Sequence, residues 1–218
     1  MVLVKEKDFV AISYTGRIKD SGTIFDLTDA DLAKKEGIYD EHNHAHYGPK
    51  IICVGEGHVI HGLDKALIGK EPGTTFIVEL NPEDAFGTRN TGLVKTIQTS
   101  LLLEQNIRPY PGLQIQGPNM MGIIRSVSGG RTIVDFNHPL AGKPLLYETK
   151  IERIIEDTTE KVRALLFVLL HLHQDAYQLT VEGTKILITP KETLPVSLTT
   201  AFKTKTEALI TGIEVMFG

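Results

Sequence analysis

The sequence has little cysteine, no tryptophan and no long apolar run. Cys53 is the one cysteine in 218 residues, which excludes disulfide bonds within the chain and favours a reducing compartment. The longest apolar run, residues 164–170, is far too short to span a bilayer. The N-terminal stretch lacks the long apolar core of a signal peptide. We therefore expect a cytoplasmic protein with no membrane partner.

An excess of positive charge is also absent. The chain has 23 Lys and Arg residues against 27 Asp and Glu residues, a formal net charge of −4 at pH 7. This balance gives no electrostatic attraction to nucleic acid, so no nucleic-acid partner is predicted. Hydrophobic residues make up 41% and charged residues 23% of the chain, as in an ordinary globular protein. The length allows one large domain or two to three small ones.

Strands dominate the first part of the sequence. Residues 9–18 alternate in character, which puts Val10, Ile12 and Tyr14 on one face of a strand. The predicted strands cover residues 9–18, 23–27, 48–57, 74–80 and 143–154. Between them, residues 61–69 have the spacing of one short helix. These elements predict an α+β fold in which an antiparallel sheet wraps on a single short helix.

A stretch of different character interrupts this pattern. Two segments are each typical of the end of a strand followed by a loop that ends in glycine. They are residues 81–87, NPEDAFG, and residues 134–142, VDFNHPLAG. Between these segments the sequence predicts a helix over residues 99–109 and three or four short strands. Insertions succeed at loop tips whose ends lie close together. We therefore expect residues 88–137 to form a small β-rich domain inserted into the first one.

Residues 156–218 predict a further α+β domain with the order αββαβ. Its first helix is expected over residues 158–173. His171 and His173 are expected on the surface of this helix. A domain of this size makes a marginal core by itself, so it needs a partner surface.

Two partner surfaces are open for this domain. Residues 164–170 are apolar all round the predicted helix, and one thin sheet cannot bury them. A two-fold contact would bury the same surface on each of two chains, which predicts a homodimer. The alternative is that Leu166, Phe167 and Leu170 dock on the rest of their own chain and keep it monomeric.

Three motifs carry a family resemblance. Residues 12–26 read ISYTGRIKDSGTIFD, residues 54–87 read VGEGHVIHGLDKALIGKEPGTTFIVELNPEDAFG, and residues 134–151 read VDFNHPLAGKPLLYETKI. They resemble the first hairpin, the core and the re-entry strand of FKBP-type peptidyl-prolyl cis–trans isomerases with an insert in the flap. The chain resembles the archaeal long-chain members, which are related to the bacterial SlyD chaperones. The implied domains are an isomerase domain of residues 1–87 and 138–155, an insert-in-flap chaperone domain of residues 88–137 and a C-terminal domain of residues 156–218.

The resemblance implies a proline pocket that needs no cofactor, nucleophile or metal. Rotation about an X–Pro bond breaks amide resonance over a barrier of about 18–20 kcal/mol, and an apolar cleft that fits the twisted form lowers it. The Ile60 N–H and the side chain of Tyr14 or Asp26 would orient the substrate carbonyls. The implied catalytic residues are Tyr14, Phe25, Asp26, Ile60, Phe86 and Tyr147. The implied lining residues are Ile52, Val59 and Leu63, the last at a position where the family often has tryptophan.

The resemblance also implies that the insert holds unfolded, proline-containing polypeptides and feeds them to the pocket. The residues expected to bind them are Ile107, Tyr110, Leu113, Ile115, Met120, Met121 and Ile123. The alternative is that half of this set forms the small core of the insert. Met120 and Met121 are adjacent on a strand, so we expect one in that core and the other on the surface.

A histidine cluster offers a possible metal site. His42, His44 and His46 stand at alternate positions, so on an extended segment their imidazoles share one face and could converge on Zn²⁺ or Ni²⁺. The alternative is a polar surface loop. No cysteine or aspartate spacing supports a metal, so no metal cofactor is predicted.

Two other functions compete with the isomerase. A holdase-type chaperone with weak or no isomerase activity would need substitutions in the pocket, and the pocket set looks intact. A hydrolase needs a nucleophile with a base, yet no G-x-S-x-G motif occurs and Cys53 lies in a predicted strand. The sequence therefore predicts a peptidyl-prolyl isomerase with chaperone function.

Overall fold

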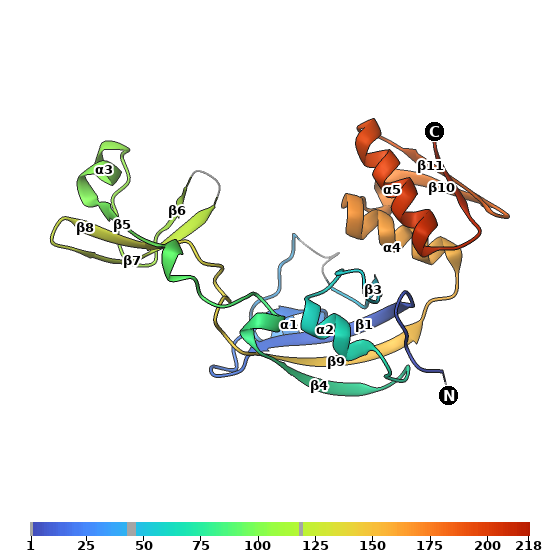
Figure 1. The fold of residues 1–218 in the computed structure, drawn as a ribbon, viewed down its shortest axis with the longest axis horizontal. Coiled ribbons are helices and arrows are strands. Elements are labelled where there is room, and N and C mark those ends of the chain that lie inside the picture. The colour runs from blue at the N-terminus through green and yellow to red at the C-terminus, as the bar shows by residue number, and fades with distance from the viewer. Residues whose placement is uncertain (1, 43–46, 118–119) are drawn as a thin grey trace. The chain divides into compact units, whose positions relative to one another are not determined.

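The computed structural model describes residues 2–42, 47–117 and 120–218. The chain divides into two compact units. One contains residues 1–80 and 146–218, and the other contains residues 81–145. The second unit therefore interrupts the first along the sequence, between the strands β4 and β9 (Figure 1).

The first unit is built on a 5-stranded sheet. Its strands are β1 (Phe9–Ile18), β2 (Ile24–Leu27), β3 (Lys50–Cys53), β4 (Thr75–Leu80) and β9 (Leu145–Ile154). They lie in the order β2-β1-β9-β4, and β3 also pairs with β1. β2 and β3 pair antiparallel with successive segments of β1, residues 15–17 and residues 9–12. With the helix described next, this sheet confirms the predicted α+β class.

Helix α2 (His61–Leu67) lies over this sheet (Figure 1). Because side chains alternate between the two faces of β1, Val10 and Ile12 lie on the same face. There they form one buried cluster with the apolar side of α2. The sequence reasoning missed a second helix, α1 (Ala30–Lys35). It begins at Asp29, whose carboxylate accepts hydrogen bonds from two backbone N–H groups of the first turn, at 2.9 and 3.0 Å.

The second unit is a small β structure with one short α-helix. Its elements are η2 (Pro82–Asp84), η3 (Thr91–Leu93), β5 (Val94–Gln98), α3 (Thr99–Glu104), β6 (Gln114–Gln116), β7 (Met121–Ser128) and β8 (Arg131–Asp135). The strands form an antiparallel sheet in the order β5-β8-β7-β6. Its buried core consists of Leu102, Ile115, Ile124 and Val134. Helix α3 stops short of the predicted residue 109 because Asn106 turns into the left-handed region, with φ of 60°.

An ion pair of Asp135 with Arg89 and a backbone hydrogen bond hold the ends of this unit together. The buried Asp135 carboxylate accepts from Arg89 at 2.6 Å and lies 3.2 Å from the guanidinium of Arg125. The Gly142 N–H donates to the Gly87 carbonyl at 2.8 Å. The chain therefore enters and leaves the unit at neighbouring points.

The C-terminal part of the first unit has the predicted order of elements. They are α4 (Thr158–Leu170), η4 (Gln174–Ala176), β10 (Tyr177–Glu182), β11 (Lys185–Pro190), α5 (Val196–Leu209) and β12 (Glu214–Phe217). The strands lie in the order β10-β11-β12, with β11 and β12 parallel. Within the described residues, no helix is both long and apolar enough to cross a membrane.

Helix α4 is shorter than predicted, and this corrects the placement of two histidines. The helix ends at Leu170, where His171 adopts the left-handed conformation with φ of 54°. His171 and His173 therefore follow the helix and do not lie on its surface.

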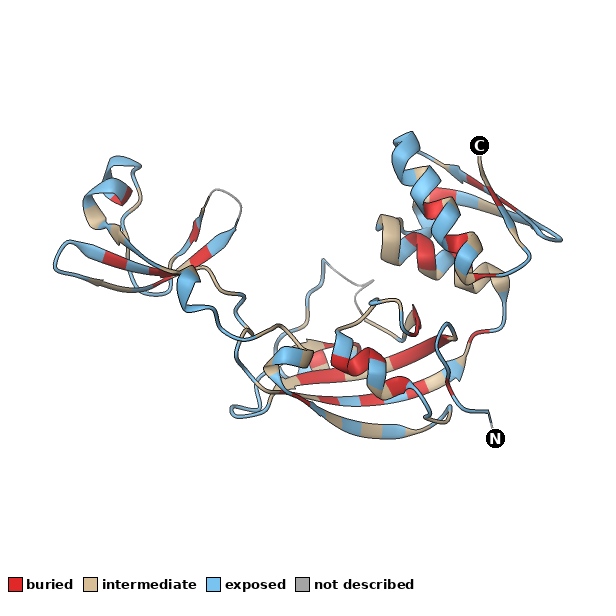
Figure 2. Cartoon of the chain, in the orientation of Figure 1, coloured by how far each residue is buried: buried red, intermediate tan, exposed pale blue. Residues whose placement is uncertain are grey.

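Helix α4 packs against the outer face of β1. Phe9, Ala11 and Cys53 share one buried cluster with Leu165 and Leu166. Figure 2 shows buried residues along β1, α2, α4 and α5. Lys205 of α5 adds an ion pair with Glu56, in the loop before α2. Docking on the same chain thus accounts for much of the apolar surface of α4.

Candidate functional site

Three aromatic rings meet where β1, β2 and β9 lie side by side. Tyr147 of β9 is buried at the centre, with ring centroids 5.7 Å from Tyr14 of β1 and 5.6 Å from Phe25 of β2. Phe25 meets Tyr147 edge to face, at 81°. Such tilted and edge-to-face contacts are favourable for aromatic pairs. We call Tyr14, Phe25 and Tyr147 the three-ring cluster.

Gly16 makes room for this cluster. A Cβ atom at this position would lie 2.7 Å from the Phe25 ring and 3.1 Å from the Tyr147 ring. The pairing register of β1 and β2 also shifts between Gly16 and Arg17. The sequence reasoning missed this residue, although a glycine inside an alternating strand is a known sign of close approach.

A hydrogen bond joins two of the predicted site residues. The Tyr14 hydroxyl donates to Asp26 Oδ2 at 3.0 Å. Burial, and then the charge of Asp26, raises the pKa of Tyr14 well above its usual value. The same two causes raise the pKa of Tyr147. Both phenols therefore stay protonated at any physiological pH.

The buried Asp64 carboxylate shapes the loop before α2. It accepts hydrogen bonds from the Gly55 N–H at 2.9 Å and from the Gly57 N–H at 3.1 Å. His58 Nδ1 accepts from the Cys53 N–H at 3.0 Å. These bonds fix the backbone that leads to Val59 and Ile60. Sequence reasoning missed Asp64, for which the only signal was an acidic residue on the inner side of a short helix.

The loop carries one predicted hydrogen-bond donor. The Ile60 N–H donates to no acceptor within the described part of the chain. Val59 and Tyr14 both pack against the buried cluster under α2. Ile52 and Leu63 are almost fully buried, so they support this region from the core, and their contact with substrate stays a prediction.

Phe86 lies in the second unit, following η2. Its ring stacks on His138, with centroids 4.4 Å apart and planes inclined by 4°. His138 in turn accepts a hydrogen bond from the Leu140 N–H at 3.2 Å through Nδ1. The orientation of the Phe86 ring is thus fixed by the loop that leads out of the unit.

The apolar residues of the insert fall into two groups. Ile115 is 7% exposed and belongs to the core, while Ile107 and Leu113 pack against it. Tyr110, Met120 and Met121 are 59%, 44% and 56% exposed. The expectation that one methionine enters the core was wrong, because Met120 precedes β7, whose first residue is Met121, and the core is filled by Leu102, Ile115, Ile124 and Val134. Ile123 is half-buried opposite Gln114.

The histidine cluster is only partly covered by the structure. His42 is exposed, and its backbone N–H donates to Asp40 Oδ1 at 2.9 Å. His44 and His46 lie outside the described residues. Among the residues that are described, no three His, Cys, Asp or Glu side chains are grouped as a metal would require.

Comparisons with known proteins match this architecture. A model of FKBP-type peptidyl-prolyl cis-trans isomerases matches residues 2–104, and one described as "FKBP26, IF domain" matches residues 100–140. The short-type peptidyl-prolyl cis-trans isomerase of Methanocaldococcus jannaschii is 30% identical over 152 residues, 70% of this chain and 94% of that protein. The FKBP-type isomerase SlyD of Treponema pallidum is 32% identical over 162 residues, 72% of this chain and 82% of that protein. SlyD of Haemophilus influenzae is 30% identical over 164 residues, covering 73% and 76%.

The raised tyrosine pKa values predict a late-titrating class in the folded protein. Tyr14 and Tyr147, two of the six tyrosines, should stay un-ionised at pH 11 by absorbance at 295 nm. In guanidinium they should ionise near the ordinary value of about 10. The unfolded state then binds fewer protons than the folded state, so the free energy of unfolding should fall as the pH rises above about 10. Full ionisation of the folded protein below pH 11 would contradict the burial of these rings.

Proposed function

The chain belongs to the FKBP-type peptidyl-prolyl cis–trans isomerases, and from this premise we propose that the three-ring cluster forms the wall of its proline pocket. The observation that carries the proposal is the position of Tyr147 between Tyr14 and Phe25. Rings at these angles leave apolar faces and edges against which a proline ring can pack. Gly16 lets the rings approach, so it belongs to the same site.

Catalysis here means helping an amide to twist. The uncatalysed rotation takes tens to hundreds of seconds because its barrier is about 18–20 kcal/mol. No bond is made or broken, so the pocket needs only to bind the twisted amide better than the planar ones. Apolar walls remove water from the amide and leave it in surroundings where its dipole is weakly solvated.

The polar groups at the edge of the cluster orient the chain. We assign the Ile60 N–H, which Asp64 helps to position through the loop, to a substrate carbonyl. The hydrogen bond from Tyr14 holds Asp26 at the rim of the pocket. Phe86 keeps its predicted catalytic role through the D-A-F-G motif, and its stack on His138 supplies a fixed ring.

The pocket proposal predicts the effect of two substitutions. Phe25→Ala removes one wall, and Gly16→Ala pushes the Phe25 ring out of place. Each should lower kcat/KM for a short Xaa-Pro peptide at least about tenfold, which is about 1.4 kcal/mol of transition-state stabilisation. Ile77→Ala, at an exposed position of β4, is the matched control and should keep wild-type turnover. A Phe25→Ala variant that circular dichroism shows folded, yet that turns over normally, would disprove the assignment.

We also propose that the second unit holds unfolded client chains. Its support is the exposed apolar group of Tyr110, Met120 and Met121, to which the exposed Leu101 and Leu103 add. Methionine adapts to irregular partners, and exposed apolar surface of this kind marks interaction sites. Membership of the isomerase family favours catalysis together with holding over holding alone. The clients are unfolded or partly folded, proline-containing polypeptides.

Removing the insert should separate the two activities. A short glycine-containing turn in place of residues 88–137 keeps the stack of Phe86 on His138 and the hydrogen bond between Gly142 and Gly87. The shortened protein should isomerise tetrapeptides at the wild-type rate. It should lose most of its advantage on an unfolded protein whose refolding is limited by proline, measured by tryptophan fluorescence of that client. Equal losses on both substrates would mean that the insert is structural.

The cellular location and the partners of the protein are also part of our proposal. We place the protein in the cytoplasm, since its one cysteine is buried and free. No nucleic-acid or membrane partner and no cofactor is predicted, and an archaeal source stays an expectation from the resemblance.

A homodimer through the C-terminal part is a further element of the proposal. Docking of α4 within the chain removes part of the original reason for it. Its remaining support is the outward face of the small sheet, where Leu187 is exposed and lies opposite Met216. Val196 and Leu198, at the start of α5, are exposed as well. Such apolar surface is typical of a two-fold contact.

The proposed dimer predicts the molecular mass in solution and a substitution that should produce the monomer. Light scattering at micromolar concentration should report about twice the 24.1 kDa chain mass. Leu187→Lys should return the monomer mass because it places a charge in the contact. Ile77→Lys, at a more exposed position on β4, should leave the dimer intact. A wild-type protein that scatters as a monomer would refute the dimer. Truncation before α4 is a poorer test, since it uncovers Phe9 and Ala11.

A further inference from the structure

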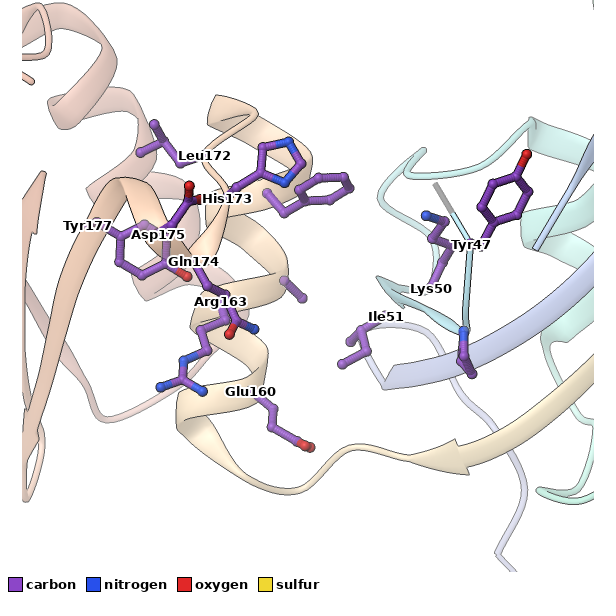
Figure 3. Close-up of a pocket in the computed structure, with 13 residues that line it drawn as sticks. Tyr47, Lys50, Ile51, Glu160, Arg163, Leu172, His173, Gln174, Asp175 and Tyr177 are labelled. Atoms are coloured by element: carbon purple, nitrogen blue, oxygen red, sulfur yellow. The ribbon is translucent and has the colours of Figure 1, made fainter. Parts of the chain in front are cut away.

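A groove of about 600 Å³ lies between β3 and α4, within the first unit (Figure 3). One wall comes from residues 47–51, and the other comes from α4 and the segment that follows it. We call this cavity the β3–α4 groove. None of the roles proposed above uses it.

The middle of the groove is apolar. Ile51, Ala164 and Phe167 line it, and the Phe167 ring is braced edge to face by His173 at 5.2 Å. Lys50 Nζ lies 5.8 Å from the centre of the Phe167 ring, on the side of β3. The aliphatic part of a side chain can therefore lie here with a cation close by.

Two hydrogen-bond donors in the α4 wall have no acceptor among the residues that the structure describes. The Tyr177 hydroxyl is buried and has no partner there, and the residue is only 6% exposed. Arg163 lies near enough for its charge to act on that hydroxyl, and it forms no ion pair among the described residues. A buried hydroxyl with no partner is costly, so a ligand that supplies an acceptor here gains by satisfying it.

The charges of the groove favour an anion. Lys50 and Arg163 are its cations, and Glu160 and Asp175 are its acids. Glu160, however, is bound by both terminal nitrogens of Arg153, each at 2.9 Å. Asp26 acts on Lys50 from outside the lining, so Arg163 is the cation beside the Tyr177 hydroxyl that favours an anion. A carboxylate is the acceptor that suits a guanidinium and a phenol together.

The groove lies close to the candidate proline pocket. Lys50 stands opposite Ile12 on β1, two residues before Tyr14. Two residues of a strand span about 7 Å. The charge of Asp26, which Tyr14 holds, acts on the Lys50 amine. A polypeptide bound by its proline would need only a few residues to enter the groove.

We propose that the β3–α4 groove binds an acidic residue of a client polypeptide, two to four residues from the proline held in the pocket. This inference rests on the proposed isomerase function and adds a side-chain preference to it. The carboxylate meets Arg163 and the Tyr177 hydroxyl, while its methylene groups lie on Phe167. Because the groove is open to solvent, the preference is moderate and weakens in salt.

Labelled peptides with one proline and a single Glu or Gln test the preference directly. The Glu or Gln occupies each of the positions two to four residues before or after the proline, and fluorescence anisotropy with the full-length protein gives Kd. At one or more positions Glu should bind about fivefold tighter than Gln, about 1 kcal/mol. Arg163→Gln should bring that ratio to about one, and 0.5 M NaCl should reduce it. Asp175→Asn, which removes the opposing acid, should increase it.

Lys161→Gln provides the matched control. Lys161 lies on the same helix but contacts the Phe9 ring at 5.6 Å and does not line the groove, so the ratio should stay about fivefold. Equal Kd values for Glu and Gln at every position, or a preference that survives Arg163→Gln, would overturn the groove. Isomerisation of the Gln peptides is measured in parallel. If the protein isomerises the Gln peptides but binds Glu and Gln equally, the groove proposal is wrong and the isomerase function stands. If it prefers Glu but isomerises no peptide, the isomerase function is wrong and the groove proposal stands.

Discussion

Alternation along β1 turns Val10 and Ile12 toward α2 and turns Phe9 and Ala11 toward α4, so the strand is buried on both faces. β3 follows the same division, since Ile52 pairs with Val10 and Cys53 pairs with Phe9. A slip of one residue would exchange the two faces and so disrupt the packing of both clusters. The register of β1 and β3 therefore fixes the base of the candidate site and the seat of the C-terminal helices at once.

The site adds two local constraints to this frame. Gly16 admits the rings of Phe25 and Tyr147, which a side chain would push apart. Asp64 ties the loop before α2 to the helix itself, through the N–H groups of two glycines. The ion pair between Lys205 and Glu56 reaches the same loop from α5. The loop that carries Val59 and Ile60 is thus held from both the isomerase part and the C-terminal part of the unit.

Periodicity in the sequence was enough to predict the α+β class and most strands, because a period of two needs only local information. The motif around Phe25 and Asp26 likewise located two residues that the fold brings beside Tyr14 and Tyr147. The ends of the helices were harder to predict. α3 and α4 stop where Asn106 and His171 adopt the left-handed conformation, which these residue types favour more than most but do not require.

Long-range packing could not be read from the sequence at all. The apolar run of α4 predicts burial but not the surface that provides it, and Phe9 and Ala11 are some 150 residues away. Met120 and Met121 were misplaced for a related reason. Their alternation predicts one inward side chain, but the core of the insert is complete without either. The structural role of Asp64 could be recognised only from the two backbone hydrogen bonds that its carboxylate accepts.

Docking of α4 on β1 also has a consequence for selectivity. Rotation about an X–Pro bond creates no net charge and weakens the amide dipole, so a cation placed away from the amide has little to stabilise in the transition state that is absent from the bound substrate. The three-ring cluster is accordingly apolar, and the cations Lys50 and Arg163 lie in the groove that α4 closes. In the proposed groove, charge affects the affinity for a particular polypeptide rather than the rate at which its X–Pro bond rotates. The two jobs can vary independently because the wall that carries Arg163 belongs to the C-terminal part, whereas the rings belong to the sheet of β1, β2 and β9.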